Sequence, residues 1–352
     1  FEVQMFGESY VQSGRAKRGR CGLATVALIL SIMLLSACSA NDAELVAMQD
    51  RTPQAPESPL TQQTLGSTAM FGAFTYGGVW QGMEPVLELE TKLGRRLDIV
   101  HWFTNWENPY FPELVEAASQ GGRLPMISWQ PHRQSVADIA AGRYDAYMRD
   151  WALGAATAPG LVYVRPFPEM NGNWTSWNGD TSTFRAAWRR MVNIFEEAGA
   201  VNVRWVFSPN VTDEPRTEAN RMEHYYPGHE YVDVLALDGY NWGDANVHYP
   251  AWRSFTEVFE VGYERITALG EQPVWIAEFA SSDEGGDKAE WVREMFATPG
   301  FDRIEALVWF DEDKEADWRI TSGADVLHAF QAALTSGPVV ASADQGQASS
   351  VD

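Results

Sequence analysis

A closed (β/α)8 barrel is the fold class that the sequence predicts, and three observations lead to it. Eight apolar, strand-like runs alternate with seven helix-like segments, a pattern typical of parallel βαβ units. The 352 residues can hold one domain of about 250 residues, the usual size of such a barrel, and nothing requires a second. The first strand-like run is not followed by the spacing GxGxxG, and GxxxxGKS/T does not occur, which disfavours an open doubly wound sheet.

The N-terminal segment, residues 1–37, is predicted to be a lipoprotein signal peptide. It has a basic region with Arg15, Lys17, Arg18 and Arg20, an apolar run from Leu23 to Leu35, and then Leu35-Ser36-Ala37-Cys38. This tetrapeptide resembles a bacterial lipobox, which implies cleavage before Cys38 and lipidation of that residue. The alternative, a transmembrane helix, is weaker because the apolar run is short for a bilayer. We therefore expect a membrane-anchored lipoprotein of the cell envelope, with its folded domain outside the cytoplasm.

The segment that follows, residues 38–68, is predicted to be a disordered linker between the lipid and the barrel. It is rich in Pro, Gln, Ser, Thr and Ala and lacks an amphipathic period. The barrel is expected to occupy residues 69–335. Residues 336–352 have the same low-complexity composition as the linker and are expected to form a disordered tail.

The barrel elements are expected in strict alternation. The strand-like runs are 71–77, 98–106, 124–132, 161–170, 203–210, 232–242, 273–281 and 305–313. The helix-like segments are Met83–Leu93, Phe111–Ser119, Val136–Gly154, Thr183–Ala198, Arg216–Tyr225, Tyr249–Leu269 and Asp287–Thr298.

Two carboxylates stand where apolar strands end. Glu169 closes the fourth run, LVYVRPFPEM, and Glu278 closes the seventh, PVWIAEFAS. A lone glutamate there would most simply be a surface residue beside a turn. In a (β/α)8 barrel, however, the carboxyl ends of all strands meet on one face, where active sites are built. Two carboxylates on that face are what glycosidic cleavage needs, one to donate a proton and one to attack or to activate water.

Aromatic and polar side chains accompany the two carboxylates at the strand ends. They are His101, Trp102, Trp129, His132, Arg165, Trp174, Asn210, Asp238, Tyr240, Trp242, Trp309 and Asp311. From this set we predict substrate binding by Trp102, His132, Arg165, Trp174, Tyr240, Trp242 and Trp309, as rings that stack on sugars or groups that bind hydroxyls. Each also has an ordinary structural reading, a core histidine for His101 and barrel filling for Trp129 or Trp309.

Composition narrows the class of partner. The net charge of −22 argues against nucleic acid, whereas 15 Trp, 12 Tyr and 17 Phe exceed what a core needs and suit a neutral sugar polymer. The six histidines are scattered and give no metal-ligand spacing such as HExxH, so we expect no metal and no cofactor. The protein is expected to act as a monomer on a polysaccharide.

Three motifs resemble glycoside hydrolase family 26. They are Arg165-Pro166-Phe167-Pro168-Glu169-Met170-Asn171-Gly172-Asn173-Trp174, Asp238-Gly239-Tyr240-Asn241-Trp242 and Ile276-Ala277-Glu278-Phe279-Ala280-Ser281. The resemblance covers most of residues 70–320 and implies a (β/α)8 barrel with a retaining mechanism. It implies that Glu169 is the general acid/base and Glu278 the nucleophile. It further implies that Tyr240 hydrogen-bonds the nucleophile and that Trp174 forms a subsite wall.

The resemblance also implies the substrate class. The family consists largely of endo-β-1,4-mannanases, so we expect a mannan endo-1,4-β-mannosidase. Mixed-linkage β-glucanases and β-1,3-xylanases belong to it too, and this chain departs from the common pattern by having Pro168 where the family has His before the acid/base. A mixed-linkage glucanase therefore stays open as an alternative. A non-catalytic carbohydrate-binding lipoprotein also stays open, although such a protein would not need both carboxylates.

Overall fold

The strands of the computed structural model close into a parallel barrel. The structure describes residues 64–65, 69–246 and 251–335. Its eight strands are β1 (Met70–Thr75), β2 (Ile99–Asn105), β3 (Leu124–Gln130), β4 (Val162–Pro166), β5 (Val203–Phe207), β6 (Val234–Asn241), β7 (Val274–Ser281) and β8 (Ile304–Asp311). Each strand pairs in parallel with its neighbours in sequence, and β1 also pairs with β8, which closes the ring. The predicted (β/α)8 fold is confirmed.

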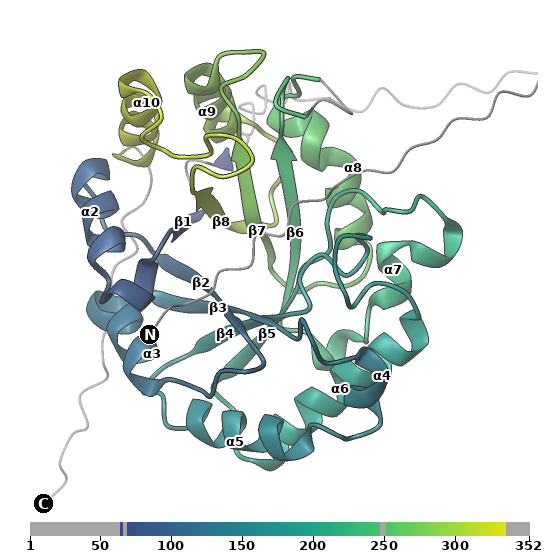
Figure 1. Ribbon diagram of the computed structural model, residues 1–352. Coiled ribbons are helices and arrows are strands. Elements are labelled where there is room, and N and C mark those ends of the chain that lie inside the picture. Colours follow the sequence, from purple (N-terminus) through teal and green to yellow (C-terminus); the bar gives the residue numbers. More distant parts are fainter. Residues whose placement is uncertain (1–63, 66–68, 247–250, 336–352) are drawn as a thin grey trace, which may run out of the picture. The chain divides into compact units, whose positions relative to one another are not determined.

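Helices surround the strands on the outside of the barrel (Figure 1). They are α2 (Glu84–Leu93), α3 (Pro112–Ser119), α4 (Val136–Ala140), α5 (Asp145–Ala155), α6 (Thr181–Glu197), α7 (Met222–Tyr225), α8 (Phe255–Thr267), α9 (Lys288–Ala297) and α10 (Ala324–Thr335). Short 3-10 turns lie at η1 (Gly78–Gln81), η2 (Gln120–Gly122), η3 (Glu218–Asn220) and η4 (His229–Tyr231). Among the described residues, none of these helices has the length and apolar character needed to cross a membrane.

Local sequence signals explain where the main helices begin. The Asp180 carboxylate accepts hydrogen bonds from the backbone N–H groups of Ser182 and Thr183 at the start of α6. At the start of α8, Ser254 and Glu257 form a reciprocal capping box. These side chains satisfy backbone donors that have no partner within the helix, so each helix begins at a defined residue.

Two apolar cores fill the barrel and the layer around it. The larger lies between the strands and the helices. The smaller fills the lumen, with Ile99, Met126, Val206, Val234, Ala236, Trp275, Ala277, Ala306 and Val308. Tyr163 of β4 and Trp275 of β7 are not on adjacent strands, yet their rings lie 4.6 Å apart, so they meet inside the barrel. Because the lumen is packed, polar chemistry is left to the face where the strands end.

The predicted elements differ most from the structure in three places. The helix expected over Val136–Gly154 is two helices, because Gly142 adopts a left-handed φ of 84° between α4 and α5. The helix expected over Arg216–Tyr225 is reduced to the short η3 and α7. Helix α10 was not anticipated. The signal peptide, Cys38, most of the linker and the tail lie outside the described residues.

Candidate active site

Glu278 on β7 is held by a cation and a phenol. The Tyr240 hydroxyl on β6 donates a hydrogen bond of 2.6 Å to its Oε1, and Arg165 Nη2 on β4 donates to its Oε2. The hydrogen bond that the family resemblance implied for Tyr240 is therefore present. The two contacts hold both carboxylate oxygens of Glu278, and Arg165 places a positive charge beside them.

Arg165 is buried beneath Glu278 and is surrounded by protein groups. Its side chain is fully buried, with Nε donating to Ser128 Oγ at 2.8 Å and Nη1 to Asp238 Oδ1 at 3.0 Å. Burial opposes its charge, but Asp238 and Glu278 outweigh that effect and raise the pKa of Arg165. The prediction that Arg165 binds substrate is therefore wrong, because every nitrogen of the guanidinium already contacts a protein group. Its position suits it to orient Glu278.

Asp238 is the second acidic partner of Arg165. It is fully buried at the point where the register between β6 and β7 shifts, and Ser208 Oγ donates to its Oδ1 at 2.6 Å. Burial raises the pKa of Asp238 well above its usual value, although Arg165 opposes the rise. Ser208 was not among the predicted site residues. The only sequence signal for it is its place directly after a strand, at the start of Ser208-Pro209-Asn210.

Glu169 is held by neutral donors. Asn210 Nδ2 donates to its Oε1 and Trp174 Nε1 to its Oε2, each at 2.6 Å. Burial raises the pKa of the Glu169 carboxyl, and the negative charge of Glu278 adds to that rise, while the two hydrogen bonds oppose it. The net effect raises the pKa of Glu169, which is the direction that a proton donor requires.

The backbone around Glu169 is unusual. Glu169 and Phe167 both have left-handed φ angles, of 55° and 51°. The Glu169 N–H donates to Ser208 O at 2.8 Å, and Trp177 Nε1 donates to Pro168 O at 2.7 Å. These bonds fix the turn that presents the Glu169 side chain, with Pro168 at its centre.

Three of the other predicted substrate-binding residues lie at the strand ends with exposed surface. Trp174 is 52% exposed, and His132 is exposed in the segment after β3, with its ring 5.5 Å from that of Trp177. Trp242 is half-buried and packs edge-on against Trp318 at 4.9 Å. Trp318 also lies 5.0 Å from the ring of Tyr240. Sequence reasoning missed Trp318, whose signal is a tryptophan in the polar segment after the eighth strand.

Trp102 and Trp309 do not face the candidate site. Both are buried in the core between strands and helices. Trp309 Nε1 donates to Trp318 O, and its ring packs against Phe330 of α10 at 4.9 Å. The prediction that these two tryptophans bind substrate is wrong, because their strands turn the neighbouring residues into the lumen and these two outward.

His101 is a core histidine. It is buried, and its Nε2 pairs with Ser128 Oγ at 2.7 Å. Burial lowers its pKa well below the usual value, with Arg165 adding to the effect, so the ring is neutral. Within the described ranges, no group of three or more His, Cys, Asp or Glu side chains could hold a metal ion.

The sequence is similar to known glycoside hydrolases. Residues 153–292 match the family model for glycosyl hydrolase family 26. The chain is 36% identical to Endoglucanase H of Acetivibrio thermocellus over 275 residues, which cover 74% of this chain and 30% of that protein. It is 26% identical to a mannan endo-1,4-beta-mannosidase of Bacillus subtilis strain 168 over 255 residues, covering 66% of this chain and 64% of that protein. The chain thus spans less than two thirds of either relative.

Solved structures support the same fold. A modular endo-beta-1,4-mannanase from Cellulomonas fimi superposes with a TM-score of 0.60 at 17% identity, over 78% of this chain and 72% of that one. The catalytic domain of a family 26 endo-beta-1,4-mannanase from Bacillus sp. JAMB-750 superposes with a TM-score of 0.59 at 18% identity, over 80% of this chain and 90% of that one.

Proposed function

We propose that the chain, whose residues 153–292 match the family model for glycosyl hydrolase family 26, is a retaining endo-hydrolase of a β-1,4-linked mannan backbone. Glu278 is the nucleophile and Glu169 the general acid/base. One observation carries this assignment. Glu278 is bonded to a buried cation and a phenol, whereas Glu169 has only neutral donors and a raised pKa.

The reaction proceeds by double displacement. In the first step a Glu278 oxygen attacks the anomeric carbon while Glu169 donates its proton to the leaving glycosidic oxygen, giving a covalent glycosyl-enzyme. In the second step Glu169, now a carboxylate, takes a proton from water, and that water displaces Glu278 from the sugar. Two inversions at the same carbon leave the β configuration unchanged. The sequence of steps requires Glu169 to change its protonation state, while Glu278 stays ionised until it attacks.

The names of relatives support a mannan backbone as the first candidate. The Bacillus subtilis relative and the solved structures with similar folds are described as mannan-cleaving enzymes. A β-glucan is the second candidate, because Endoglucanase H has the higher identity, 36% against 26%. The aligned part is only 30% of that protein. Mannose and glucose differ in the orientation of one hydroxyl at C2, so the geometry of the subsite next to Glu278 decides between them.

Product analysis tests the proposal. The purified protein is incubated with galactomannan, glucomannan, lichenan and β-1,3-xylan, and reducing ends and product sizes are measured. We expect mannan-containing polymers to be cleaved fastest, into a mixture of oligosaccharides. A large preference for lichenan would replace the first candidate by the second. Proton NMR of early products should show the β-anomer, and an α-anomer would exclude the retaining mechanism.

We further propose that the lipid on Cys38 tethers the enzyme to a membrane. The support is the predicted signal peptide and linker. Stable anchoring takes more than one acyl chain, so we expect multiple acylation of Cys38. Changing Cys38 to Ala should release the protein or leave it unprocessed. Unaltered membrane fractionation of processed protein would contradict the proposal.

A further inference from the structure

The carboxyl group of Glu169 depends on a residue of another segment for its position. Asn210 donates to Glu169 Oε1, and Asn210 lies just after β5. Its own carboxamide oxygen accepts from the Thr212 N–H at 2.9 Å, which fixes the side chain relative to its backbone. Whatever holds the backbone of Asn210 therefore also sets the hydrogen bond to Glu169.

Asn171 holds that backbone at two points. Its Oδ1 accepts from the Asn210 N–H, and its Nδ2 donates to Asn210 O, each at 2.8 Å. The carboxamide thus pairs with one residue as a neighbouring strand would. Asn171 is fully buried and lies two positions after Glu169, so the segment with the acid and the segment with its hydrogen-bond donor are joined.

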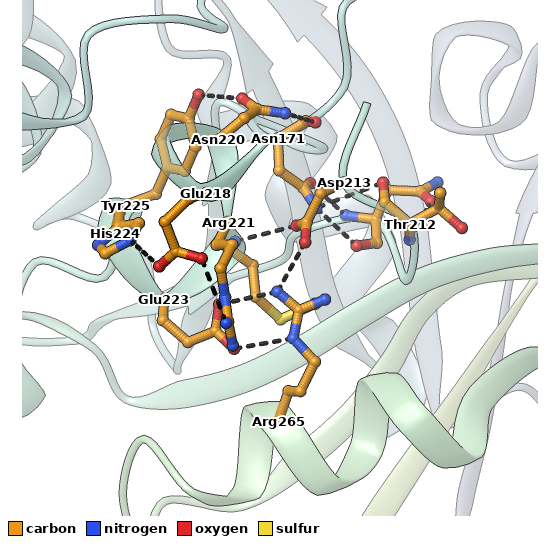
Figure 2. Close-up of polar contacts among 12 residues, drawn as sticks. Asn171, Thr212, Asp213, Glu218, Asn220, Arg221, Glu223, His224, Tyr225 and Arg265 are labelled. Atoms are coloured by element: carbon orange, nitrogen blue, oxygen red, sulfur yellow. Dashed lines mark hydrogen bonds and ion pairs between the residues drawn. The ribbon is translucent and has the colours of Figure 1, made fainter. Parts of the chain in front are cut away.

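Asp213 and Arg265 anchor Asn171 in turn (Figure 2). Asn171 Nδ2 also donates to Asp213 Oδ1 at 2.9 Å, and the Met222 N–H donates to the same oxygen at 3.0 Å. Arg265, on α8, donates from Nη2 to Asp213 Oδ2 at 2.8 Å. It also binds both carboxylate oxygens of Glu223, at 2.8 and 2.7 Å.

Arg265 is a strong anchor because its contacts are charged, bidentate and partly buried. The side chains of Arg265 and Asp213 are 19% and 13% exposed. The hydrogen bonds from Arg265 hold the pKa of Glu223 well below its usual value. A planar guanidinium that binds two carboxylates fixes their relative positions more closely than a single-point contact does.

We propose that Arg265 and Asp213 are positioning residues that act through Asn171 on the general acid/base. This inference rests on the proposed function of Glu169. The ion pair between Arg265 and Asp213 holds the segment after β5 in place against the turn at Glu169. The Asn210 side chain can then donate its hydrogen bond to the Glu169 carboxyl group. When the pair is broken, the acid is displaced from the leaving-group oxygen and loses a donor that stabilises its ionised form.

The test compares substrates that need the acid with substrates that do not. Arg265→Met is assayed on the polysaccharide and on a 2,4-dinitrophenyl glycoside of the preferred sugar, whose leaving group needs no proton. We expect kcat/KM on the polysaccharide to fall roughly ten- to a hundredfold, the scale for a misplaced catalytic group. The rate of glycosyl-enzyme formation from the dinitrophenyl substrate should change less than about twofold. The alkaline limb of the pH profile should move to higher pH, because the Asn210 bond lowers the pKa of Glu169.

The control is Arg221→Gln. Arg221 donates to Glu223 Oε1 at 3.1 Å but makes no hydrogen bond with Asp213, so this variant removes an arginine from the same cluster and should leave both substrates unaffected. Arg265→Lys and Asp213→Asn should give smaller losses of the same kind and serve if Arg265→Met does not fold. Equal losses on both substrates with an unmoved alkaline limb would overturn the inference, as would no loss in any of the three variants.

A separate measurement distinguishes this inference from the proposed function. If the wild-type protein hydrolyses no glycoside, the proposed function fails. Titration of Glu169 by NMR on carboxyl-labelled protein then tests the positioning alone. A higher Glu169 pKa in Arg265→Met than in wild type and in Arg221→Gln supports it, and an unchanged value refutes it.

Discussion

Glu278 lies within β7 and Glu169 lies in the turn after β4 of the same barrel, yet they are held by partners of different kinds. Glu278 receives a hydrogen bond from buried Arg165 and another from Tyr240. Glu169 receives two from neutral groups, an amide and an indole. The comparison teaches that the position of a carboxylate on the barrel does not define its task. In the mechanism that we propose, the charge of the partners distinguishes the nucleophile from the acid.

The largest loss of activity is expected when Glu278, the carboxylate with a charged partner, is removed. Glu278→Ala should lower kcat by about 10⁵-fold or more, the scale for loss of a catalytic nucleophile. No covalent intermediate should form on any substrate, including dinitrophenyl glycosides. Mass spectrometry after a fluorosugar inhibitor checks this. A labelled peptide in the variant would show that another carboxylate attacks.

Removal of Glu169, the carboxylate with neutral partners, should cause a smaller loss of activity. The size of this loss should depend on the leaving group. Glu169→Ala should lose roughly 10²- to 10⁴-fold on polysaccharide, the usual contribution of a general acid. Dinitrophenyl substrates should still form the glycosyl-enzyme, and azide should then accelerate turnover and yield a β-glycosyl azide. Equal losses on activated and natural substrates would contradict the assignment.

Arg165→Met tests whether the charged environment also supports the fold. Removing one partner of a buried ion pair typically costs about 3–5 kcal/mol in the free energy of unfolding, because a buried charge is left uncompensated. Urea denaturation measures this cost. Arg123→Met is a matched control, since Arg123 forms a buried bidentate pair with Glu90 at the start of β3. Both variants should be destabilised, but only Arg165→Met should lose activity per folded molecule.

Trp174→Phe sharpens the comparison with a small change. It keeps an aromatic ring but removes the N–H that donates to Glu169. A hydrogen bond to a charged group contributes about 1.5 kcal/mol, or roughly one pKa unit, and less at an exposed residue such as Trp174. Activity requires protonated Glu169 and is lost as pH rises through its raised pKa. The alkaline limb of kcat/KM should therefore move upward by up to about one unit, and a downward shift would contradict this account.

The sequence predicted the barrel well because alternation of strands and helices is a local pattern. Each of the eight expected runs overlaps one strand of the structure. The two catalytic candidates followed from one further rule, that strands of a barrel end on a common face. The break at Gly142 was harder to predict from the sequence. A glycine inside a helical pattern can either be accommodated within one helix or mark the end of a helix.

The surroundings of the catalytic candidates were harder to predict. A strand of this barrel is apolar on both faces, so the sequence does not tell whether His101 or Trp102 points into the lumen. The same ambiguity led to the wrong expectation for Trp309. Arg165 was placed in the site correctly but assigned to the substrate, because its buried partners come from distant strands. The contacts of Arg265 with Asp213 and Glu223 join segments far apart in the chain and leave no local signal.

The left-handed backbone of Glu169 means that glycine fits this position with less strain than any residue with a β-carbon. A residue with a β-carbon at φ 55° loses about 1–2 kcal/mol relative to an ordinary conformation, a cost that glycine avoids. Glu169→Gly should therefore melt at a higher temperature than Glu169→Ala, although both lack the carboxyl group and are equally impaired as acids. Stability alone would favour glycine at this position, so a glutamate with this backbone conformation is consistent with the acid/base role proposed for it.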